Sequence, residues 1–255
     1  MQKISTICSS YKSGNKIDII IKSFNNQDYD YKELIIVEGS ETDSNFKLLC
    51  KKNINNKNIK IFYLPNSTIY ECLNYGIKKS SGEIINIMGD DDKYINEKVF
   101  KNISDKLSET LDYIYGNTIF EYEGKNVRYY KSYNLNNKLM NIGYMPSHTS
   151  LFLKKEIYDK LGDYNVKYKI ASDLEFFFRL VKYSQRYLYI NRALTVMSDG
   201  GTSNKSIRNI LISNIESLKI LKKNNYNLTP LRLLLKLIFK VYLITKFKYS
   251  KKIYE

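Results

Sequence analysis

The chain has 255 residues, and its 41 Lys and Arg against 26 Asp and Glu give a formal net charge of +15. With 43% hydrophobic residues and three prolines, it has the composition of a globular protein rather than a disordered one. Three widely spaced cysteines and a single histidine exclude a disulfide framework, a Cys/His zinc cluster and a multi-histidine metal site.

The positive charge is concentrated near the C-terminus. Residues 204–255 contain 12 Lys and Arg and only two acids, Glu216 and Glu255, whereas residues 1–203 contain 29 basic and 24 acidic residues. The body of the chain is therefore nearly balanced, which argues against an extended nucleic-acid-binding surface. No signal peptide and no apolar stretch of about 18 residues is recognisable, so we expect a cytoplasmic protein without a membrane span.

Strands and helices alternate over the first ninety residues. The apolar pattern predicts strands at 4–8, 33–37, 59–63 and 83–88, separated by helices at 16–24, 46–52 and 68–79. This alternation is typical of βαβ units, so we expect an α/β fold with a mixed, mainly parallel sheet flanked by helices.

The second half is less regular. It predicts a helix at 99–107, a hairpin of 113–122 with 126–130, a strand at 150–153 and a helix at 172–183. Two further helices, 207–223 and 230–247, follow a break at Gly200-Gly201. We therefore predict one mixed α/β domain over residues 1–203 and a basic amphipathic helical tail over residues 204–255.

Acidic residues follow two of the predicted strands, where open parallel sheets bind ligands. Asp90-Asp91-Asp92 follows the strand at 83–88, and three adjacent carboxylates repel one another unless a cation such as Mg²⁺ or Mn²⁺ neutralises them. The alternative is a solvated acidic turn that caps the next helix. Glu38 follows the strand at 33–37 and can accept hydrogen bonds from a base or a ribose, or else belong to a helix-capping cluster.

Other candidate residues lie in the second half. Asp173 and Glu175 open the helix at 172–183, where either a general base or a simple match to the helix dipole explains an acid. They are two positions apart, so they face different directions. His148, the only histidine, could reach a phosphate or a metal, or be structural. Gly200 and Gly201 could form a loop that closes over phosphates, although no P-loop and no G-x-G-x-x-G occurs.

The predicted helix at 230–247 carries a narrow basic stripe. Arg232, Lys236 and Lys240 recur every four residues on an otherwise apolar helix. This pattern suits either an anionic membrane surface or a helix packed on the body with one wet edge.

Together these segments resemble family 2 glycosyltransferases of the GT-A (Rossmann-like) fold, particularly bacterial enzymes of cell-surface polysaccharide biosynthesis. Ser9-Ser10-Tyr11 is similar to the family segment that borders the nucleotide base, and Val37-Glu38-Gly39-Ser40-Glu41-Thr42-Asp43 to the segment that meets uracil. The stretch from Ile69 to Ile77, with Asn74, also resembles the family pattern. The resemblance covers residues 4–203 and implies a nucleotide-binding half at 1–95 and an acceptor half at 96–203.

The resemblance also implies roles for the acids. Asp92 falls at the metal ligand, Asp90 also fits the Asp-x-Asp form, and Asp91 falls near the ribose and donor sugar. Asp173 falls at the catalytic base of the family's acidic helix. His148, Glu175, Gly200 and Gly201 become possible contacts of the diphosphate or the acceptor.

The resulting expectation is an inverting, metal-dependent glycosyltransferase that uses Mn²⁺ or Mg²⁺ and a nucleotide-sugar donor, with UDP as the expected nucleotide. The acceptor would be a saccharide or a lipid-linked saccharide, and the tail would hold the enzyme on the inner face of the membrane. One alternative is a sugar nucleotidyltransferase, but residues 9–14 contain only one Gly and one Lys with which to hold a triphosphate. The other is a non-enzymatic basic protein that binds nucleic acid.

Overall fold

The computed structural model describes residues 1–122, 124–135, 139–140, 143–198 and 206–225. The first part alternates strands with helices, as predicted: β1 (Ile4–Ser10), α1 (Asp18–Asn25), β2 (Lys32–Glu38), α2 (Ser44–Lys52), β3 (Ile59–Tyr63), α3 (Ile69–Lys79) and β4 (Ile84–Met88). The elements that follow are β5 (Lys93–Tyr94), α4 (Val99–Lys106), β6 (Tyr113–Tyr122), β7 (Lys125–Tyr130), the 3-10 turn η1 (His148–Ser150), β8 (Leu151–Lys154), α6 (Lys155–Leu161), α7 (Ser172–Tyr183), β9 (Tyr187–Ser198) and α8 (Ile207–Lys223).

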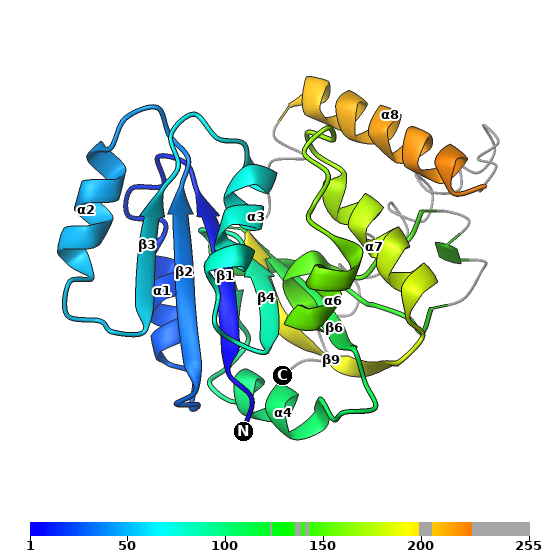
Figure 1. The fold of residues 1–255 in the computed structure, drawn as a ribbon, viewed down its shortest axis with the longest axis horizontal. Coiled ribbons are helices and arrows are strands. Elements are labelled where there is room, and N and C mark those ends of the chain that lie inside the picture. Colours follow the sequence, from blue (N-terminus) through cyan, green and yellow to red (C-terminus); the bar gives the residue numbers. More distant parts are fainter. Residues whose placement is uncertain (123, 136–138, 141–142, 199–205, 226–255) are drawn as a thin grey trace.

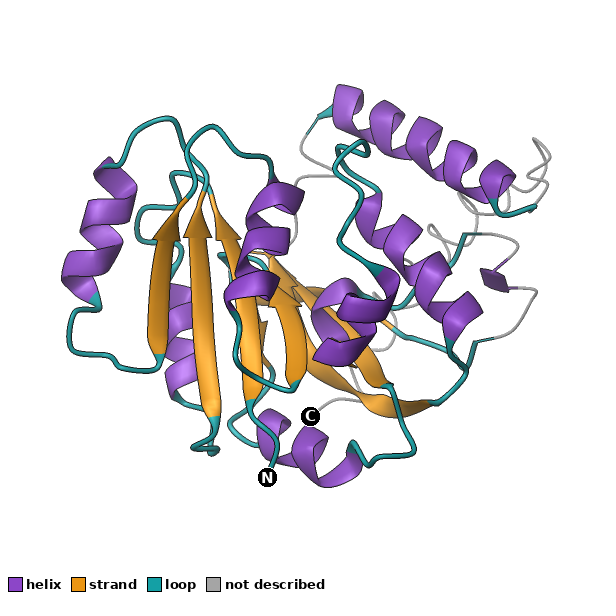
Figure 2. Cartoon of the chain, viewed as in Figure 1, coloured by secondary structure: helices purple, strands orange, loops and turns teal. Residues whose placement is uncertain are grey.

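The described strands form one mixed sheet in the order β3-β2-β1-β4-β8-β6-β9-β5, with β7 paired to β6 (Figure 2). The strands β3, β2, β1 and β4 are parallel, as the βαβ pattern predicts. From β8 onward the sheet is mixed, because β8 runs antiparallel to both β4 and β6 while β9 runs parallel to β6. The first half of the chain thus supplies the parallel part of the sheet.

Helices cover both faces of the parallel strands, which explains why β2 carries apolar residues toward both faces. In β2, Ile35 and Val37 pack into the core beneath α3 and α7, whereas Leu34 and Ile36 pack into the core beneath α1 and α4. Figure 1 shows α3, α6 and α7 on one side of the sheet and α1 on the other. Helix α3 approaches β1 closely, since a Cβ on Gly76 would lie 2.5 Å from Cγ2 of Ile7.

Three of the described strands and α-helices were not predicted: β5, α6 and β9. The register of β9 on β6 shifts between Tyr189 and Ala193, so the three residues 190–192 of β9 face the single residue Gly116 of β6. This irregularity breaks the period-2 pattern by which a strand is recognised in a sequence. The strand β5 has only two residues, which is too short for any pattern.

Helix α8 coincides with the predicted helix at 207–223 and packs against α7 (Figure 1). Its residues Ile220 and Leu221 are buried in the same core as α3 and α7. The predicted helix at 230–247 and the pair Gly200-Gly201 lie outside the described residues. Within the part of the chain that is described, no helix combines the length and apolarity needed to cross a membrane.

Candidate active site

The ends of β1, β2 and β4 lie side by side at the carboxyl edge of the sheet. Ser10 at the end of β1 pairs with Glu38 at the end of β2, and Cys8 pairs with Met88 at the end of β4. The polar segments that follow these strands in the sequence therefore meet at one edge, as expected for a ligand site of a parallel sheet.

Glu38 is completely buried at this edge, and its carboxylate is saturated by protein donors. Oε1 accepts hydrogen bonds from the backbone N–H groups of Lys12 and Ser40, both at 3.1 Å. Oε2 accepts from Oγ of Ser10 at 2.5 Å and from the amide of Asn45. Burial alone would raise the pKa of Glu38, but the hydrogen bonds outweigh it and the pKa is lowered. The charged carboxylate thus ties the loop after β1 to the loop after β2.

The acidic segment after β4 is held by its own backbone and by β9. Asp92 is 3% exposed; its Oδ2 accepts from the N–H of Gly89 at 2.9 Å and its Oδ1 from the N–H of Ser198 at 3.2 Å. Burial raises the pKa of Asp92 to about 7, and the charges of Asp91 and Asp90 contribute to this rise. Burial also raises the pKa of Asp90, whose carboxylate accepts a hydrogen bond from Ser13.

Asp173 lies at the start of α7. Its Oδ1 accepts from the N–H of Leu174 at 2.8 Å and lies 3.4 Å from the hydroxyl of Tyr70 on α3. Its Oδ2 lies 3.9 Å from Nδ1 of His148 in η1. Burial raises the pKa of Asp173, and the neighbouring His148 opposes this shift. A carboxylate with a raised pKa is a stronger proton acceptor, as a general base requires.

The turn that carries His148 is fixed by buried hydroxyls and amides. Thr149 Oγ1 lies 3.0 Å from Thr195 Oγ1 of β9, and the amide of Asn86 in β4 donates to the carbonyl oxygens of Thr149 and Leu151 at 2.9 Å. Burial lowers the pKa of His148, while the charge of Asp173 raises it. The imidazole is thus placed by β4 and β9 and faces the carboxylate of α7.

One cleft with a volume of about 550 Å³ collects these groups. Ser9, Asp90, Asp91, Asp92, His148 and Asp173 all line it. Its other walls are the aromatic and apolar side chains Phe120, Tyr130, Met145 and Met197, and the cations Arg128 and Lys169. A cleft of this size, with convergent polar groups on an apolar wall, is typical of a small-molecule site.

The other predicted site residues do not line this cleft. The amide of Asn74 makes two hydrogen bonds of 2.9 Å with the backbone of Tyr164, and Glu175 pairs with Arg179 at 3.0 Å. Ser10 and Glu38 are buried and hydrogen-bonded to each other, and the hydroxyl of Tyr11 donates to Glu41 at 2.5 Å. Gly200 and Gly201 lie outside the described residues.

Several residues that line the cleft could not be identified from the sequence alone. Tyr70, Lys169 and Ser198 line the cleft, as do Ser213 and Asn214 of α8, although α8 belongs to the predicted tail. Only Tyr70 could have been identified from the sequence, since it lies in the stretch from Ile69 to Ile77 that resembles the family. The others come from segments without a recognisable motif.

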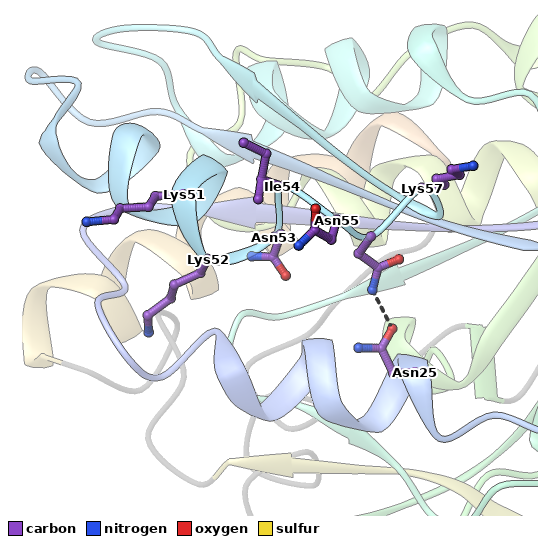
Figure 3. A pocket seen from close by; sticks show the side chains of 8 residues that line it. Asn25, Lys51, Lys52, Asn53, Ile54, Asn55 and Lys57 are labelled. Carbon is purple, nitrogen blue, oxygen red and sulfur yellow. Dashed lines mark hydrogen bonds between the residues drawn. The ribbon is translucent and has the colours of Figure 1, made fainter.

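A second depression lies between the end of α2 and the loop before β3 (Figure 3). Asn25 and residues 51–57 line it, and a 3.0 Å hydrogen bond joins the amide of Asn56 to Oδ1 of Asn25. It contains no acid, and Ile54 is 81% exposed beside it. This depression lies at the amino edge of the sheet and takes no part in the acidic cleft.

The acidic segment has the hard oxygen donors that Mg²⁺ and Mn²⁺ prefer. Burial and mutual repulsion outweigh the hydrogen bonds to Asp90 and Asp92 and disfavour their charges, and a divalent cation would stabilise these charges. Within the described ranges, no three His, Cys, Asp or Glu side chains are grouped to hold a metal by themselves. The residues therefore fit a cation that takes some of its ligands from a bound phosphate.

The sequence profile described as "Glycosyl transferase family 2" matches residues 5–182. The chain belongs to glycosyl transferase family 2. The matched segment contains β1 to β4, the acidic segment and the start of α7 with Asp173. The resemblance seen in the sequence is thereby confirmed, and membership favours a glycosyltransferase over the nucleotidyltransferase and nucleic-acid-binding alternatives.

Curated relatives of this family 2 glycosyltransferase are distant. An "Uncharacterized glycosyltransferase" of Haemophilus influenzae is 28% identical over 130 residues, covering 50% of this chain and 52% of the relative. The "GalNAc(5)-diNAcBac-PP-undecaprenol beta-1,3-glucosyltransferase" of Campylobacter jejuni is 25% identical over 128 residues, covering 49% of this chain and 40% of the relative. The matched part is thus about half or less of each relative.

Solved structures show that the fold is GT-A, as predicted. Residues 1–349 of S. aureus TarS in complex with UDP-GlcNAc match 89% of this chain and 68% of that chain, with a TM-score of 0.65 and 18% identity. The mannosyltransferase PcManGT of Pyrobaculum calidifontis, in complex with GDP-Man and Mn²⁺, matches 95% of this chain and 70% of that chain, with a TM-score of 0.64 and 13% identity. At these identities the likeness concerns the fold alone.

Proposed function

We propose that this protein is an inverting glycosyltransferase that moves a sugar from a UDP-sugar to a hydroxyl group of a saccharide or lipid-linked acceptor. The observation that carries the proposal is the cleft itself. It brings together the acids after β4 and the acid at the start of α7, which are far apart in the sequence, as lining groups of one cavity. A single displacement at a sugar carbon needs both groups: acids that hold a cation at the leaving group, and an acid that takes the proton of the attacking hydroxyl.

The nucleotide-sugar would bind at the carboxyl edge of β1 and β4. Ser9 and Asp91 line this end of the cleft and offer polar groups to a ribose or a sugar. Ser10, Tyr11 and Glu38 would act by shaping the loop that borders the base, because Glu38 holds that loop through its hydrogen bonds. Asn74 would act indirectly, by holding the segment that contains Tyr164. The UDP-GlcNAc complex of TarS and the GDP-Man complex of PcManGT are consistent with a nucleotide-sugar donor.

Asp92, with Asp90, would hold Mn²⁺ or Mg²⁺ together with the donor diphosphate. When bound, the cation would offset the charge that develops on the leaving nucleoside diphosphate. Asp92 suits this task because β9 fixes its carboxylate through the N–H of Ser198.

Asp173 would remove the proton from the attacking hydroxyl of the acceptor. Its burial raises its pKa, and Tyr70 and His148 orient its two oxygens. The hydroxyl oxygen would then attack the anomeric carbon from the face opposite the leaving group, and one such displacement inverts the configuration. His148 could also meet the diphosphate or the acceptor. Glu175 pairs with Arg179 and would support α7 rather than contact substrate.

The acceptor would lie against the second half of the cleft. Phe120, Tyr130 and Met145 form an apolar and aromatic wall there, which suits the faces of a sugar ring. The undecaprenol-linked acceptor in the name of the Campylobacter relative is consistent with a lipid-linked saccharide.

The basic stripe of Arg232, Lys236 and Lys240 would hold the enzyme on an anionic membrane surface, on its cytoplasmic side. Replacing all three by Gln in the full chain should weaken co-sedimentation with vesicles of phosphatidylglycerol but not with vesicles of phosphatidylcholine. Equal binding of both proteins to the anionic vesicles would refute this part of the proposal.

A thermal-shift screen of UDP-GlcNAc, UDP-glucose, GDP-mannose and UTP, each with Mn²⁺ or with EDTA, tests the function. We expect stabilisation by a UDP-sugar that depends on Mn²⁺. Stabilisation by UTP with release of pyrophosphate from UTP and a sugar phosphate would instead indicate a nucleotidyltransferase. No shift with any of these ligands would contradict the proposal.

A further inference from the structure

The carboxylate of Glu216 in α8 is hydrogen-bonded to the backbone of the segment that leads into α7. Its Oε1 accepts a hydrogen bond from the N–H of Lys169 at 2.7 Å, and its Oε2 accepts from the N–H groups of Ile170 and Ala171, both at 2.9 Å. The residue is 8% exposed. A buried carboxylate with three backbone donors is a strong connection, because hydrogen bonds to charged groups are stronger than neutral ones.

The carboxylate of Glu216 also lies at the start of α7, where it binds the N–H of the N-cap residue Ala171. Ala171 precedes α7, and no side-chain hydrogen bond from it caps the helix. Alanine is a poor N-cap residue because it has no acceptor to offer to the first N–H groups. The carboxylate of Glu216 supplies negative charge at this end of the helix, where the helix dipole favours it.

The segment bound by Glu216, residues 169–171, also determines where Asp173 lies. The carbonyl oxygen of Ile170 accepts a hydrogen bond from the hydroxyl of Tyr70 at 2.6 Å, and the same hydroxyl lies 3.4 Å from Oδ1 of Asp173. A shift of residues 169–171 would therefore move both the start of α7 and the hydroxyl that contacts Asp173.

Helix α8 is anchored in the core, so it can hold Glu216 against residues 169–171. Ile220 and Leu221 are fully buried one turn beyond Glu216, while Ser213 and Asn214 line the cleft about one turn before it. Helix α8 follows the segment matched by the family profile, which ends at residue 182. Glu216, which holds residues 169–171, thus lies outside the part of the chain that the family profile matches.

We propose that Glu216 is a positioning residue that holds Asp173 in place through the backbone of residues 169–171. This inference rests on the proposed function only for its catalytic consequence, since the structural connection can be measured without any substrate.

The test compares Glu216→Gln with Ile220→Ala in the full chain. The glutamine side chain of Glu216→Gln would keep one acceptor oxygen but turn an NH₂ group toward backbone donors. Ile220→Ala weakens the packing of the same helix without touching the three hydrogen bonds. Glu216→Asp keeps the charge on a shorter side chain and should restore part of any loss.

The first readout is amide hydrogen exchange at residues 169–171. We expect faster exchange in Glu216→Gln than in Ile220→Ala. The second is the NMR titration of His148, whose signal is unambiguous because the chain has one histidine. Tyr70 of α3 and Tyr164 of the segment before α7 interact electrostatically with Asp173, and Glu216 of α8 interacts with Tyr70. Because the charge of Asp173 raises the pKa of His148, displacement of Asp173 should move that pKa toward its value in Asp173→Asn.

The third readout is Mn²⁺-dependent release of UDP from UDP-GlcNAc, measured well below the melting temperature of each variant. We expect kcat to fall about tenfold or more in Glu216→Gln with little change in KM for the donor, and to stay near wild type in Ile220→Ala. Unchanged exchange and an unchanged His148 titration in Glu216→Gln would overturn the inference. Altered exchange and titration with no UDP release by the wild type would uphold the positioning of Asp173 but contradict the proposed function with this donor.

Discussion

Oδ2 of Asp173 lies 3.9 Å from Nδ1 of His148, so the start of α7 faces the turn before β8 across the acidic cleft. Burial raises the pKa of the carboxyl group and lowers that of the imidazole, and each charge opposes the shift of the other. The raised pKa makes the carboxylate of Asp173 a stronger proton acceptor, as a general base for an acceptor hydroxyl requires.

Asp173→Asn should lower the transfer rate by about a thousandfold, because the amide cannot take a proton. The melting temperature should stay the same or rise, since burial disfavours the charge that the substitution removes. Initial rates of UDP release and differential scanning calorimetry measure the two effects. Asp159→Asn on the exposed side of α6 is the control and should change neither. Full activity in Asp173→Asn would rule this residue out as the base.

Asp92→Asn should abolish the metal-dependent stabilisation by a UDP-sugar. The new amide would place an N–H₂ group near the N–H of Gly89 or Ser198 and would lose the charge that holds a cation. In the wild type, EDTA should remove the same stabilisation and Mn²⁺ should restore it, as thermal-shift curves would show. Asp18→Asn, in an exposed pair with Lys52, serves as the control. A wild-type shift in Asp92→Asn would mean that the cation binds elsewhere.

Glu33 should make the protein sensitive to acid. Its side chain is 2% exposed; burial raises its pKa, but the hydrogen bonds from Lys60, Ser5 and Ser81 outweigh this and lower the pKa from 4.5 to about 2. The unfolded chain therefore takes up this proton at a higher pH than the folded chain. The contribution of Glu33 to stability, about 3 kcal/mol, is present above pH ~4.5 and is lost as the pH falls toward 2.

Urea unfolding at intervals between pH 6 and pH 2.5 measures this effect. The free energy of unfolding should fall more steeply below pH 4.5 in the wild type than in Glu33→Gln. Glu156→Gln, in an exposed i,i+4 pair with Lys160, should follow the wild-type curve. Parallel curves for the wild type and Glu33→Gln would refute the prediction.

Asn74→Ala should destabilise the protein by about 2 kcal/mol, because it leaves the buried N–H and carbonyl of Tyr164 without their partner. We expect the affinity for the UDP-sugar to change little, since Asn74 does not line the cleft. Urea unfolding and isothermal calorimetry separate the two effects. Asn55→Ala, in the exposed depression of Figure 3, is the control. A tenfold loss of affinity at unchanged stability would support the direct donor contact that the family resemblance implies.

The βαβ half of the fold was predictable because its strands are buried on both faces. Residues 34–37 are a continuous apolar run and residues 84–88 are apolar except for Asn86, and each run is followed by polar residues where the chain leaves the core. Parallel pairing then requires these polar ends to meet at one edge, so the place of Asp90–Asp92 followed from the order of elements. The identity of Asp173 as a candidate came from the family resemblance and from its place at the start of a helix.

The second half was harder to predict because its contacts join distant segments. The bulged pairing of β9 with β6 leaves no regular pattern in β9. Asn74 resembles a donor-binding residue in sequence, yet its amide is used by a backbone ninety positions later. Glu216 is one of two acids in a basic stretch, and no local pattern marks the three backbone groups that it binds.

The sequence by itself determined the βαβ order, the acids at the strand ends and the membership of family 2, because these depend on local patterning and on spacing along the chain. The tertiary structure decided which acids share a cleft, which predicted ligands are instead held by backbone groups, and that α8 is part of the cleft wall. Hydrogen bonds and burial between distant segments determine these features, and such contacts leave no periodic trace in the order of the residues.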